Sequence, residues 1–330
     1  MDFSELSRLA SSHVEARIIQ VAVTLGIFDL LNSKNLDATA VGRSLRANRR
    51  AMELLLNALV ALGLLKKREH LYSLSSISAT YLVTSSPKYF GDMILFESTL
   101  WDSWGALKKA VQTGKPVRPT DMFQKDPKET EQFIGAMHSL VRARGDAEIL
   151  LEQLNLVGIT KLLDIGSGPG TYPICFCRKY PGLRVTILDL PGTMKITERF
   201  VAAAGLGTQI KLVTGNYRTD PIPGTYQMVF LSNIIHGEGV KENTRLMAKI
   251  YPRLEAGGKI VLKDHVLNED LTEPSVGAVF SLLMLLTTRN GRCYAFKEIK
   301  GWLETAGFEA VRHIPLPSPL LSSLVIGEKN

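Results

Sequence analysis

Hydrophobic residues recur at helical spacing between residues 12 and 62 and then form two short runs around a polar turn. Glycines interrupt the helical pattern at Gly26 and end it at Gly63. The predicted helices cover 12–31, 38–45 and 49–62, and the predicted strands cover 64–68 and 71–74. Two helices joined by a turn and followed by a hairpin form the pattern of a winged helix.

The helix predicted over 49–62 decides between two roles for this region. Its apolar residues surround most of the helix: Met52, Leu54, Leu55, Leu56, Ala58, Leu59, Val60 and Leu62. A helix that reads DNA needs a polar face, whereas a helix that is apolar nearly all round belongs in an interior or an interface. We therefore expect residues 1–88 to form a winged-helix-like dimerisation domain with no nucleic-acid partner. A DNA-binding regulator that senses a metabolite is the alternative.

The next segment, residues 89–155, has the pattern of an all-helical region. The apolar spacing predicts two long helices, Phe90–Gln112 and Lys128–Leu154, joined by a polar connection that contains prolines. We interpret this segment as a link between domains that also covers the substrate.

Beyond Lys161 the period changes to short apolar strands that alternate with helices. The predicted strands are 161–165, 184–188, 209–213, 227–232 and 259–263, and the predicted helices are 172–180, 193–204, 241–254, 275–288 and 296–306. This alternation predicts an α/β fold, a doubly wound parallel sheet with helices on both faces. Two last runs, 308–314 and 321–326, flank a proline-rich turn and predict a C-terminal antiparallel hairpin.

Composition narrows the class of protein. The 330 residues carry 39 Lys and Arg against 32 Asp and Glu, a net charge of +7, and 45% are hydrophobic, so the chain is not a disordered one. Three cysteines exclude a disulfide framework. No apolar run has the length of a membrane span, and the polar N-terminus does not have the pattern of a signal peptide. We expect a cytoplasmic protein with no membrane partner.

A glycine-rich loop follows the first strand of the α/β region. Glycines at 166, 168 and 170 allow a ligand to approach the backbone where the next helix begins. The third glycine comes one residue too early for the dinucleotide pattern. Asp164, which enters this loop, would repel a pyrophosphate but suits a cationic sulfonium or ammonium group. Asp189 ends the next strand, where an acid binds ribose hydroxyls or, alternatively, caps the following helix.

These motifs resemble a known family. The stretches DIGSGPG at 164–170, LDLP at 188–191, ESTLWDSWGALKKAV at 97–111 and the region of His236 look like those of the class I S-adenosylmethionine-dependent small-molecule O-methyltransferases. The group contains plant caffeate, flavonoid and acetylserotonin enzymes and bacterial relatives, and the likeness covers nearly the whole chain. It implies a homodimer formed through the N-terminal domain, and a Rossmann-like catalytic domain at 156–330 that binds S-adenosylmethionine and releases S-adenosylhomocysteine.

The resemblance also implies a set of cofactor contacts. Residues of the glycine loop would pass under the methionine part and the ribose, the ribose hydroxyls would meet the end of the second strand, and two residues would flank the adenine. The implied cofactor residues are Asp164, Gly166, Gly168, Gly170, Asp189, Leu190, Asn216, Tyr217 and Ser232. Asn216 stands where the family usually has an acid, and its amide can still accept from an adenine amino group. Ser232 stands where plant members often carry a lysine near the cofactor carboxylate.

His236 is the candidate base. Methyl transfer from a sulfonium to a hydroxyl requires alignment and removal of a proton, and histidine titrates near neutrality. His236 lies just beyond the fourth strand, at the sheet edge where ligands of open α/β folds bind, and it resembles the catalytic histidine of the family. Asp264 ends the fifth strand at the same edge, where it would orient the imidazole or cap a loop. Gly237 and Cys293 replace family acids, so the base is weaker or the acceptor hydroxyl is already acidic.

The acceptor site follows from the resemblance alone. Its implied contacts are Met137, Met284, Thr288, Phe123 and Trp101. We expect no metal, because the sequence has no spaced set of metal ligands, and no covalent step at Cys293. The sequence therefore predicts methyl transfer to a hydroxyl, most simply a phenolic one, of a small molecule. Transfer to carbon or nitrogen by proximity in the same fold is the alternative within this class.

Overall fold

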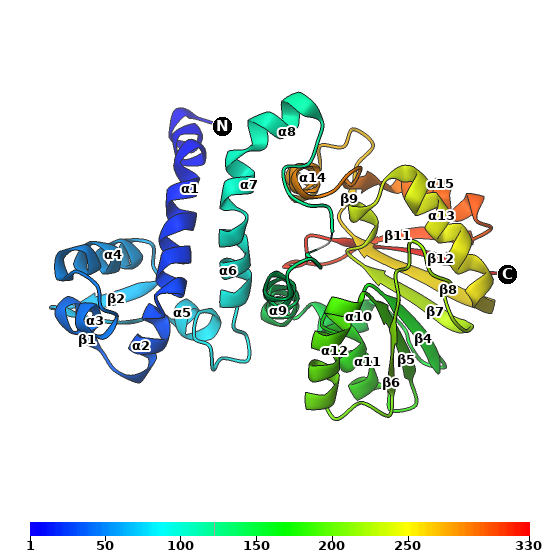
Figure 1. Cartoon of the computed structure of the whole chain (residues 1–330), viewed down its shortest axis with the longest axis horizontal. Coiled ribbons are helices and arrows are strands. Elements are labelled where there is room, and N and C mark those ends of the chain that lie inside the picture. The colour runs from blue at the N-terminus through cyan, green and yellow to red at the C-terminus, as the bar shows by residue number, and fades with distance from the viewer. Residues whose placement is uncertain (122) are drawn as a thin grey trace. The chain divides into compact units, whose positions relative to one another are not determined.

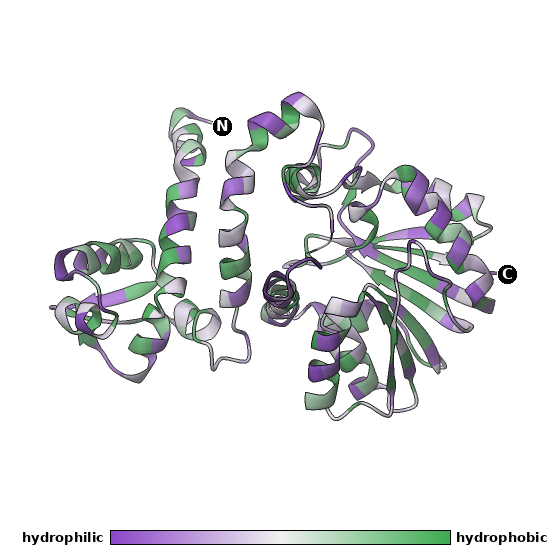
Figure 2. Ribbon diagram, viewed as in Figure 1, coloured by the Kyte–Doolittle hydropathy of each residue, from purple (hydrophilic) through white to green (hydrophobic). Residues whose placement is uncertain are grey.

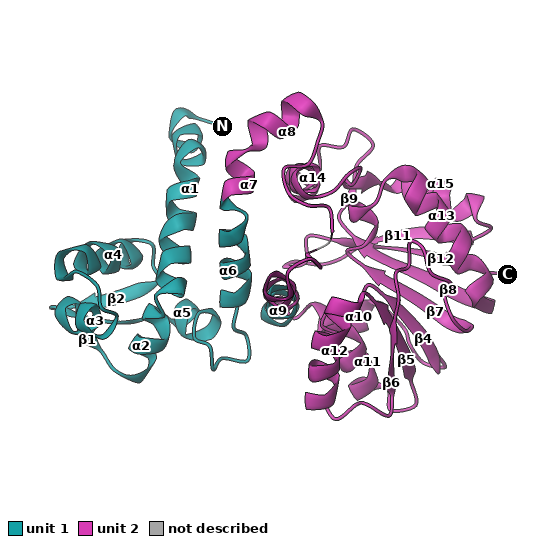
Figure 3. Cartoon of the chain, viewed as in Figure 1, with its two compact units in different colours: residues 1–101, 135–143 teal, residues 102–134, 144–330 magenta. Residues whose placement is uncertain are grey.

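The computed structural model describes residues 1–121 and 123–330, and the chain forms two compact units. Unit 1 contains residues 1–101 and 135–143, and unit 2 contains residues 102–134 and 144–330 (Figure 3). None of the helices within the described ranges is long and apolar enough to cross a membrane.

Unit 1 is mainly helical, with a small sheet. Its elements are α1 (Phe3–Thr24), α2 (Ile27–Ser33), β1 (Leu36–Asp37), α3 (Ala38–Ser44), α4 (Arg49–Ala61), β2 (Leu65–Arg68), β3 (Leu71–Leu74), α5 (Ser76–Tyr81) and α6 (Gly91–Thr99). The three strands lie in the order β1-β3-β2, and β3 is antiparallel to both neighbours. Side chains of Asp37 and Asn48 accept backbone N–H bonds at the starts of α3 and α4, which satisfies donors that a helix leaves free.

Helix α4 buries one side only within the chain. Met52, Leu56 and Leu59 are buried in the core of unit 1, whereas Leu54 is 60% exposed. The first turns of α1 are exposed on all sides as well. Apolar residues thus remain on the outside of unit 1.

The structure corrects the two long helices predicted between the domains. The predicted helix 90–112 is three helices, α6, α7 (Trp101–Gly105) and α8 (Leu107–Thr113). The predicted helix 128–154 is two, α9 (Pro127–Arg144) and α10 (Asp146–Gln153), separated by Gly145 in the left-handed region at φ +72°. Each break is one residue long, so the apolar spacing continues across it and conceals it in the sequence. Glycine adopts the left-handed backbone without steric cost.

Unit 2 is built around a seven-stranded sheet. Its other elements are β4 (Lys161–Ile165), α11 (Thr171–Lys179), β5 (Arg184–Asp189), α12 (Pro191–Ala203), β6 (Ile210–Thr214), β7 (Tyr226–Ser232), η1 (Ile235–Gly237), α13 (Val240–Ile250), η2 (Tyr251–Arg253), β8 (Leu254–Asp264), β9 (Val266–Leu267), α14 (Ser275–Thr287), β10 (Tyr294–Ala295), α15 (Phe296–Thr305), β11 (Glu309–Pro315) and β12 (Ser323–Glu328). The strand order is β11-β12-β8-β7-β4-β5-β6, and β9 and β10 form a separate parallel pair.

The large sheet confirms the fold class predicted from the sequence. The five strands from β8 to β6 are parallel, and β12 and β11 complete the edge as an antiparallel hairpin. The order reverses at β4, which has β5 on one side and β7 on the other. Ligands of open α/β sheets bind at such a reversal, outside the carboxyl ends of the strands.

Both faces of this sheet are covered by helices (Figure 1). On one face, Leu163, Val229 and Leu262 pack in a single cluster with residues of α13 and α15. On the other face, the ring of Phe230 on β7 makes edge contacts with Tyr172 and Phe176 of α11. The strands are accordingly green over much of their length in Figure 2, as expected of parallel strands buried on both faces.

Gly166 allows the ends of β4 and β7 to approach each other. Its backbone is left-handed, at φ +69°, and a Cβ at this position would lie 2.3 Å from Cδ1 of Ile234. Ile234 is buried between β7 and η1. A side chain at 166 would therefore strain the backbone and displace the segment that leads into η1.

We predict that Gly166→Ala lowers the free energy of unfolding by about 2–4 kcal/mol, combining left-handed strain with overpacking. Urea denaturation of the purified variant measures this loss. Gly182→Ala is the matched control, because Gly182 is exposed, has an ordinary backbone and has nothing within 4 Å of the added Cβ. Equal stability of the two variants would contradict the role assigned to Gly166.

Candidate active site

Titratable side chains lie at or just beyond the carboxyl ends of four neighbouring parallel strands. Asp164 lies in β4 next to its end, Asp189 ends β5, His236 follows β7 within η1, and Asp264 ends β8. Each of them is 8% exposed or less. Parallel strands present these ends at one edge of the sheet, so the structure brings together the residues that the sequence placed at successive strand ends.

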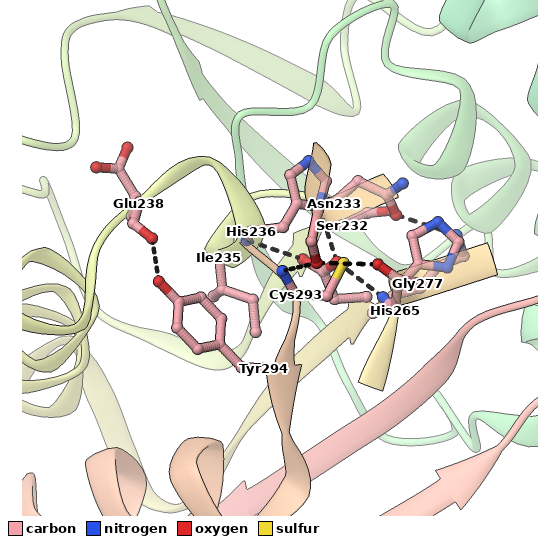
Figure 4. A network of polar contacts seen from close by, with 12 residues as sticks. Ser232, Asn233, Ile235, His236, Glu238, His265, Gly277, Cys293 and Tyr294 are labelled. Carbon is pink, nitrogen blue, oxygen red and sulfur yellow. Dashed lines mark hydrogen bonds and ion pairs between the residues drawn. The ribbon is translucent and has the colours of Figure 1, made fainter. Parts of the chain in front are cut away.

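His236 and Asp264 form a buried pair. The Nδ1 atom of His236 lies 2.7 Å from Oδ1 of Asp264, and the backbone N–H of His236 donates to Oδ2 of the same carboxylate at 3.4 Å. Figure 4 shows His236 within a network of polar contacts at this edge. A carboxylate accepts but does not donate, so Nδ1 carries the hydrogen and Nε2 is left as the basic nitrogen.

The electrostatic setting keeps Asp264 ionised. Burial raises the pKa of Asp264, but the neighbouring His236 and His265 outweigh it, and the pKa lies below its ordinary value. A carboxylate that stays charged beside an imidazole stabilises the imidazolium form when the ring takes up a proton.

The rings of Phe280 and His265 lie beside the pair, and of these two Phe280 was not predicted from the sequence. The ring of Phe280 on α14 contacts the rings of both His236 and His265, at centroid distances of 4.8 and 5.2 Å. His265 has Nδ1 2.6 Å from the carbonyl oxygen of Leu321, and burial lowers its pKa. The available signal was the helical spacing of Phe280 and Met284, which puts both on one face of α14.

Cys293 lies in the same network as a neutral thiol (Figure 4). Burial and the nearby Asp264 raise the pKa of the thiol to about 12. The backbone N–H of Cys293 donates to Oγ of Ser281 on α14. Position 293 therefore adds no negative charge to the His236–Asp264 pair.

The glycine loop forms a cradle tied to Asp189. Gly166, Gly168 and Gly170 all have left-handed backbones, at φ +69°, +59° and +74°. The N–H of Gly168 donates to Oδ2 of Asp189 at 2.8 Å, and the N–H of Leu190 donates to Oδ1 at 2.7 Å. Burial raises the pKa of Asp189 to about 6, although these two amides lower it. Each carboxylate oxygen has a second lone-pair direction for a ligand hydroxyl.

Asp164 carries an incompletely satisfied carboxylate. Its Oδ2 accepts from the Ser167 hydroxyl at 2.7 Å, whereas its buried Oδ1 has no hydrogen-bond partner among the described residues. Burial raises the pKa of Asp164 to about 7, Ser167 lowers it and Asp189 raises it. A buried acceptor without a partner is costly, so a ligand that brings N–H donors or positive charge would be stabilised here.

Asn216 and Tyr217 lie in the turn after β6. Oδ1 of Asn216 accepts from the N–H of Arg218 at 3.0 Å. The hydroxyl of Tyr217 and Nε of Arg218 both donate to Oε1 of Glu238, each at 2.6 Å. Glu238 was also missed in the sequence, although its position two residues after His236 was a signal. Through these bonds the Tyr217 ring is fixed beside the segment that carries His236.

The expected acceptor contacts divide between the two units. Met284 and Thr288, both buried, lie in and directly after α14, and Phe123 stacks on Phe133 at a centroid distance of 4.6 Å in the same unit. A cavity of about 260 Å³ opens beside Thr288, lined also by Arg218, Glu238, Arg289 and Asn290. Trp101 and Met137 belong to unit 1, and their part in an acceptor site stays a prediction.

Comparison with known proteins covers the whole chain. A family model described as the O-methyltransferase dimerisation domain matches residues 7–84, and one described as the O-methyltransferase domain matches residues 104–309. The 3-hydroxy-5-methyl-1-naphthoate 3-O-methyltransferase of Streptomyces sahachiroi is 30% identical, over 98% of this chain and 94% of that protein. The L-tyrosine C(3)-methyltransferase of Streptomyces lavendulae is 28% identical, over 94% and 88%.

Solved structures give the same result. The human N-acetylserotonin methyltransferase, crystallised in complex with S-adenosylmethionine, superposes with a TM-score of 0.90 at 25% identity, over 100% of this chain and 99% of that one. The fold and the matches in sequence agree, and the family expected from the motifs is confirmed. The chain belongs to the O-methyltransferase family.

Proposed function

We propose that this protein transfers a methyl group from S-adenosylmethionine to a phenolic hydroxyl of a small molecule, with His236 as the general base. The observation that carries the proposal is the buried His236–Asp264 pair at the sheet edge, beside the glycine cradle of β4. The relative from Streptomyces sahachiroi is named for O-methylation of a hydroxynaphthoate, which supports an aromatic acceptor.

The cradle fits the cofactor's two functional ends. The unpaired Oδ1 of Asp164 suits the ammonium group of the methionyl part, and the carboxylate of Asp189 suits two ribose hydroxyls. A Cβ at Gly168 would meet only Ile134, at 3.8 Å, so the missing side chain leaves the loop backbone open at this glycine. When bound, S-adenosylmethionine supplies a methyl group already activated by the sulfonium charge.

The residues of this chain then have separate tasks. Nε2 of His236 takes the proton of the acceptor hydroxyl, and Asp264 stabilises the imidazolium that results. Phe280 holds the imidazole ring on one side and, with Met284, offers an apolar wall to a flat acceptor. The neutral thiol of Cys293 leaves the charge balance of the pair unchanged.

Methyl transfer to carbon is a second candidate with its own support. The relative from Streptomyces lavendulae is named for transfer to C(3) of tyrosine, a ring carbon next to a phenolic hydroxyl. Deprotonation of that hydroxyl by His236 would activate the neighbouring carbon as well as the oxygen. The two reactions therefore share a base and differ in which acceptor atom is aligned with the methyl group.

We also propose a homodimer formed through residues 1–88. The N-terminal half of α1 is exposed on all sides, whereas helices in proteins are stabilised mostly by the packing of an apolar face. Its apolar side chains Phe3, Leu6, Leu9 and Val14 are 48–84% exposed. A second copy of the chain that covers these side chains would account for the exposed apolar residues of α1 and for the exposed Leu54 of α4. The match to a dimerisation domain agrees with this arrangement.

Replacement of the base tests the proposed reaction. With isotopically labelled S-adenosylmethionine and phenolic acceptors, His236→Ala should lower kcat by about 10²–10⁴-fold while the dissociation constant for S-adenosylhomocysteine stays nearly unchanged. His313→Ala, on the edge strand β11, is the matched control and should keep full activity. A near-normal kcat in His236→Ala would rule out the base. Resistance of the label to ether cleavage would assign transfer to carbon.

The pH dependence of cofactor-product binding tests the role of Asp164. Because its pKa in the free protein is raised to about 7, the carboxyl is partly protonated below that pH. An ammonium ligand favours the ionised form, so binding should strengthen from pH 6 to pH 8, release protons at the lower pH, and level off above. Calorimetry in two buffers with different ionisation enthalpies measures both effects. Asp164→Asn should bind weakly with a flatter profile, and a pH-independent affinity of the unaltered protein would contradict this assignment.

Sedimentation tests the dimer. The double variant Leu6→Asp/Leu9→Asp should shift the protein from dimer to monomer, because two charges in an apolar interface lose their hydration. Val157→Asp, at a 74% exposed position in unit 2, is the control and should remain dimeric. A monomeric unaltered protein, or a variant that still dimerises, would refute the interface.

A further inference from the structure

A buried group of charges lies beside the pair and has no part in the proton transfer. Lys263, the residue before Asp264 on β8, is 2% exposed, and Asp146 at the start of α10 is completely buried. Arg144 and Tyr172 contact the same aspartate. Fully buried lysines are rare unless paired, so this group calls for a physical explanation.

The carboxylate of Asp146 is already satisfied without Lys263. Arg144 donates to both oxygens, from Nε at 2.9 Å and from Nη2 at 2.7 Å, and the Tyr172 hydroxyl donates to Oδ2 at 3.1 Å. Such a bidentate arrangement is the strong form of this ion pair. Arg144 and Lys263 thus share the one carboxylate of Asp146, and the next negative charge that acts on Lys263, that of Asp264, is already paired with His236.

The ammonium group of Lys263 is under-satisfied. Its Nζ lies 3.3 Å from Oδ1 of Asn233 and 3.6 Å from Oδ2 of Asp146, so among the described residues one acceptor lies within hydrogen-bonding distance for three N–H donors. Burial lowers the pKa of Lys263, as does the nearby Arg144, whereas Asp146 and Asp264 raise it in part. An anionic ligand would supply both the missing acceptor and the missing charge.

Lys263 also lies where such a ligand is expected. It pairs in register with Ser232 of β7, the strand next to β4, so the two side chains share a face of the sheet. On that face Nζ of Lys263 lies 5.7 Å from the ring of Tyr172. Tyr172 comes two residues after Gly170, the last glycine of the cradle. Figure 4 shows Ser232 and Asn233 in the network around His236.

We infer that Lys263, together with the Ser232 hydroxyl, binds the methionyl carboxylate of the cofactor. This inference rests on the placement of the cofactor under the proposed function. Asp164 and Lys263 then receive the two opposite charges of the amino-acid end, one from β4 and one from β8. Ser232 is neutral, and the positive charge is carried by Lys263, its neighbour in the adjacent strand. The Asp146–Arg144 pair and Asn233 hold the lysine in place.

A pair of ligands that differ only in the carboxylate tests this inference. S-adenosylhomocysteine and its decarboxylated analogue, 5′-(3-aminopropylthio)-5′-deoxyadenosine, share the nucleoside, the thioether and the ammonium group. Calorimetry on the unaltered protein should show at least about ten-fold tighter binding of the first. Lys263→Met should weaken the binding of S-adenosylhomocysteine by about 10–100-fold and change the dissociation constant of the analogue by no more than about two-fold.

Two further variants separate binding from folding. Lys263→Arg should keep most of the preference for the carboxylate, because it keeps the charge. Lys259→Met, on the same strand but on the surface beside Glu328, should change neither affinity. An equal loss of affinity for both ligands in Lys263→Met would show that Lys263 has a structural role and would overturn the inference. An unaltered protein that binds the two ligands equally well would also overturn it. An unaltered protein that binds neither ligand would instead refute the proposed function.

Discussion

The register of β4, β7 and β8 is the constraint on which the site depends. These strands are parallel and adjacent, so their ends reach one edge, and β4 lies where the strand order reverses. A slip of one residue would turn every side chain to the opposite face. Asp264 would then leave His236, and Lys263 would leave the side of the sheet that faces α11. The absence of a side chain at Gly166 permits the close approach of Ile234 and completes this arrangement.

The edge is also a place where buried charges are only partly compensated. Asp264 is paired with His236, and Asp146 with Arg144. Oδ1 of Asp164 has no partner among the described residues, and Nζ of Lys263 has one close acceptor. The two groups carry opposite charges, as do the two ends of an amino acid. A protein that keeps such groups buried gains most when a zwitterionic ligand satisfies both, because unpaired buried polar groups are costly.

Local patterns predicted the elements of unit 2 well and those between the domains less well. The alternation of strands and helices beyond Lys161 favours a parallel sheet, and each predicted strand overlaps an observed one, although β8 begins at Leu254, within the predicted helix, and β9 and β10 were not predicted. The helices predicted over 90–112 and 128–154 are interrupted, because a one-residue break such as Gly145 leaves the apolar spacing intact. Two contacts at the site were not predicted from the sequence, that of Lys263 with Asp146 and that of Phe280 with His236. Each joins residues more than forty positions apart, which a local pattern does not relate.

The sequence by itself determined which side chains stand at the ends of strands, because the period of the hydrophobic pattern marks each strand and its last residue. It therefore determined the fold class, the glycine loop, and the positions of Asp164, Asp189, His236 and Asp264 along the chain. Only the tertiary structure decided which of these groups are paired and which are left with unused donors or acceptors. That outcome depends on burial and on distances between segments far apart in the chain, which no local pattern contains.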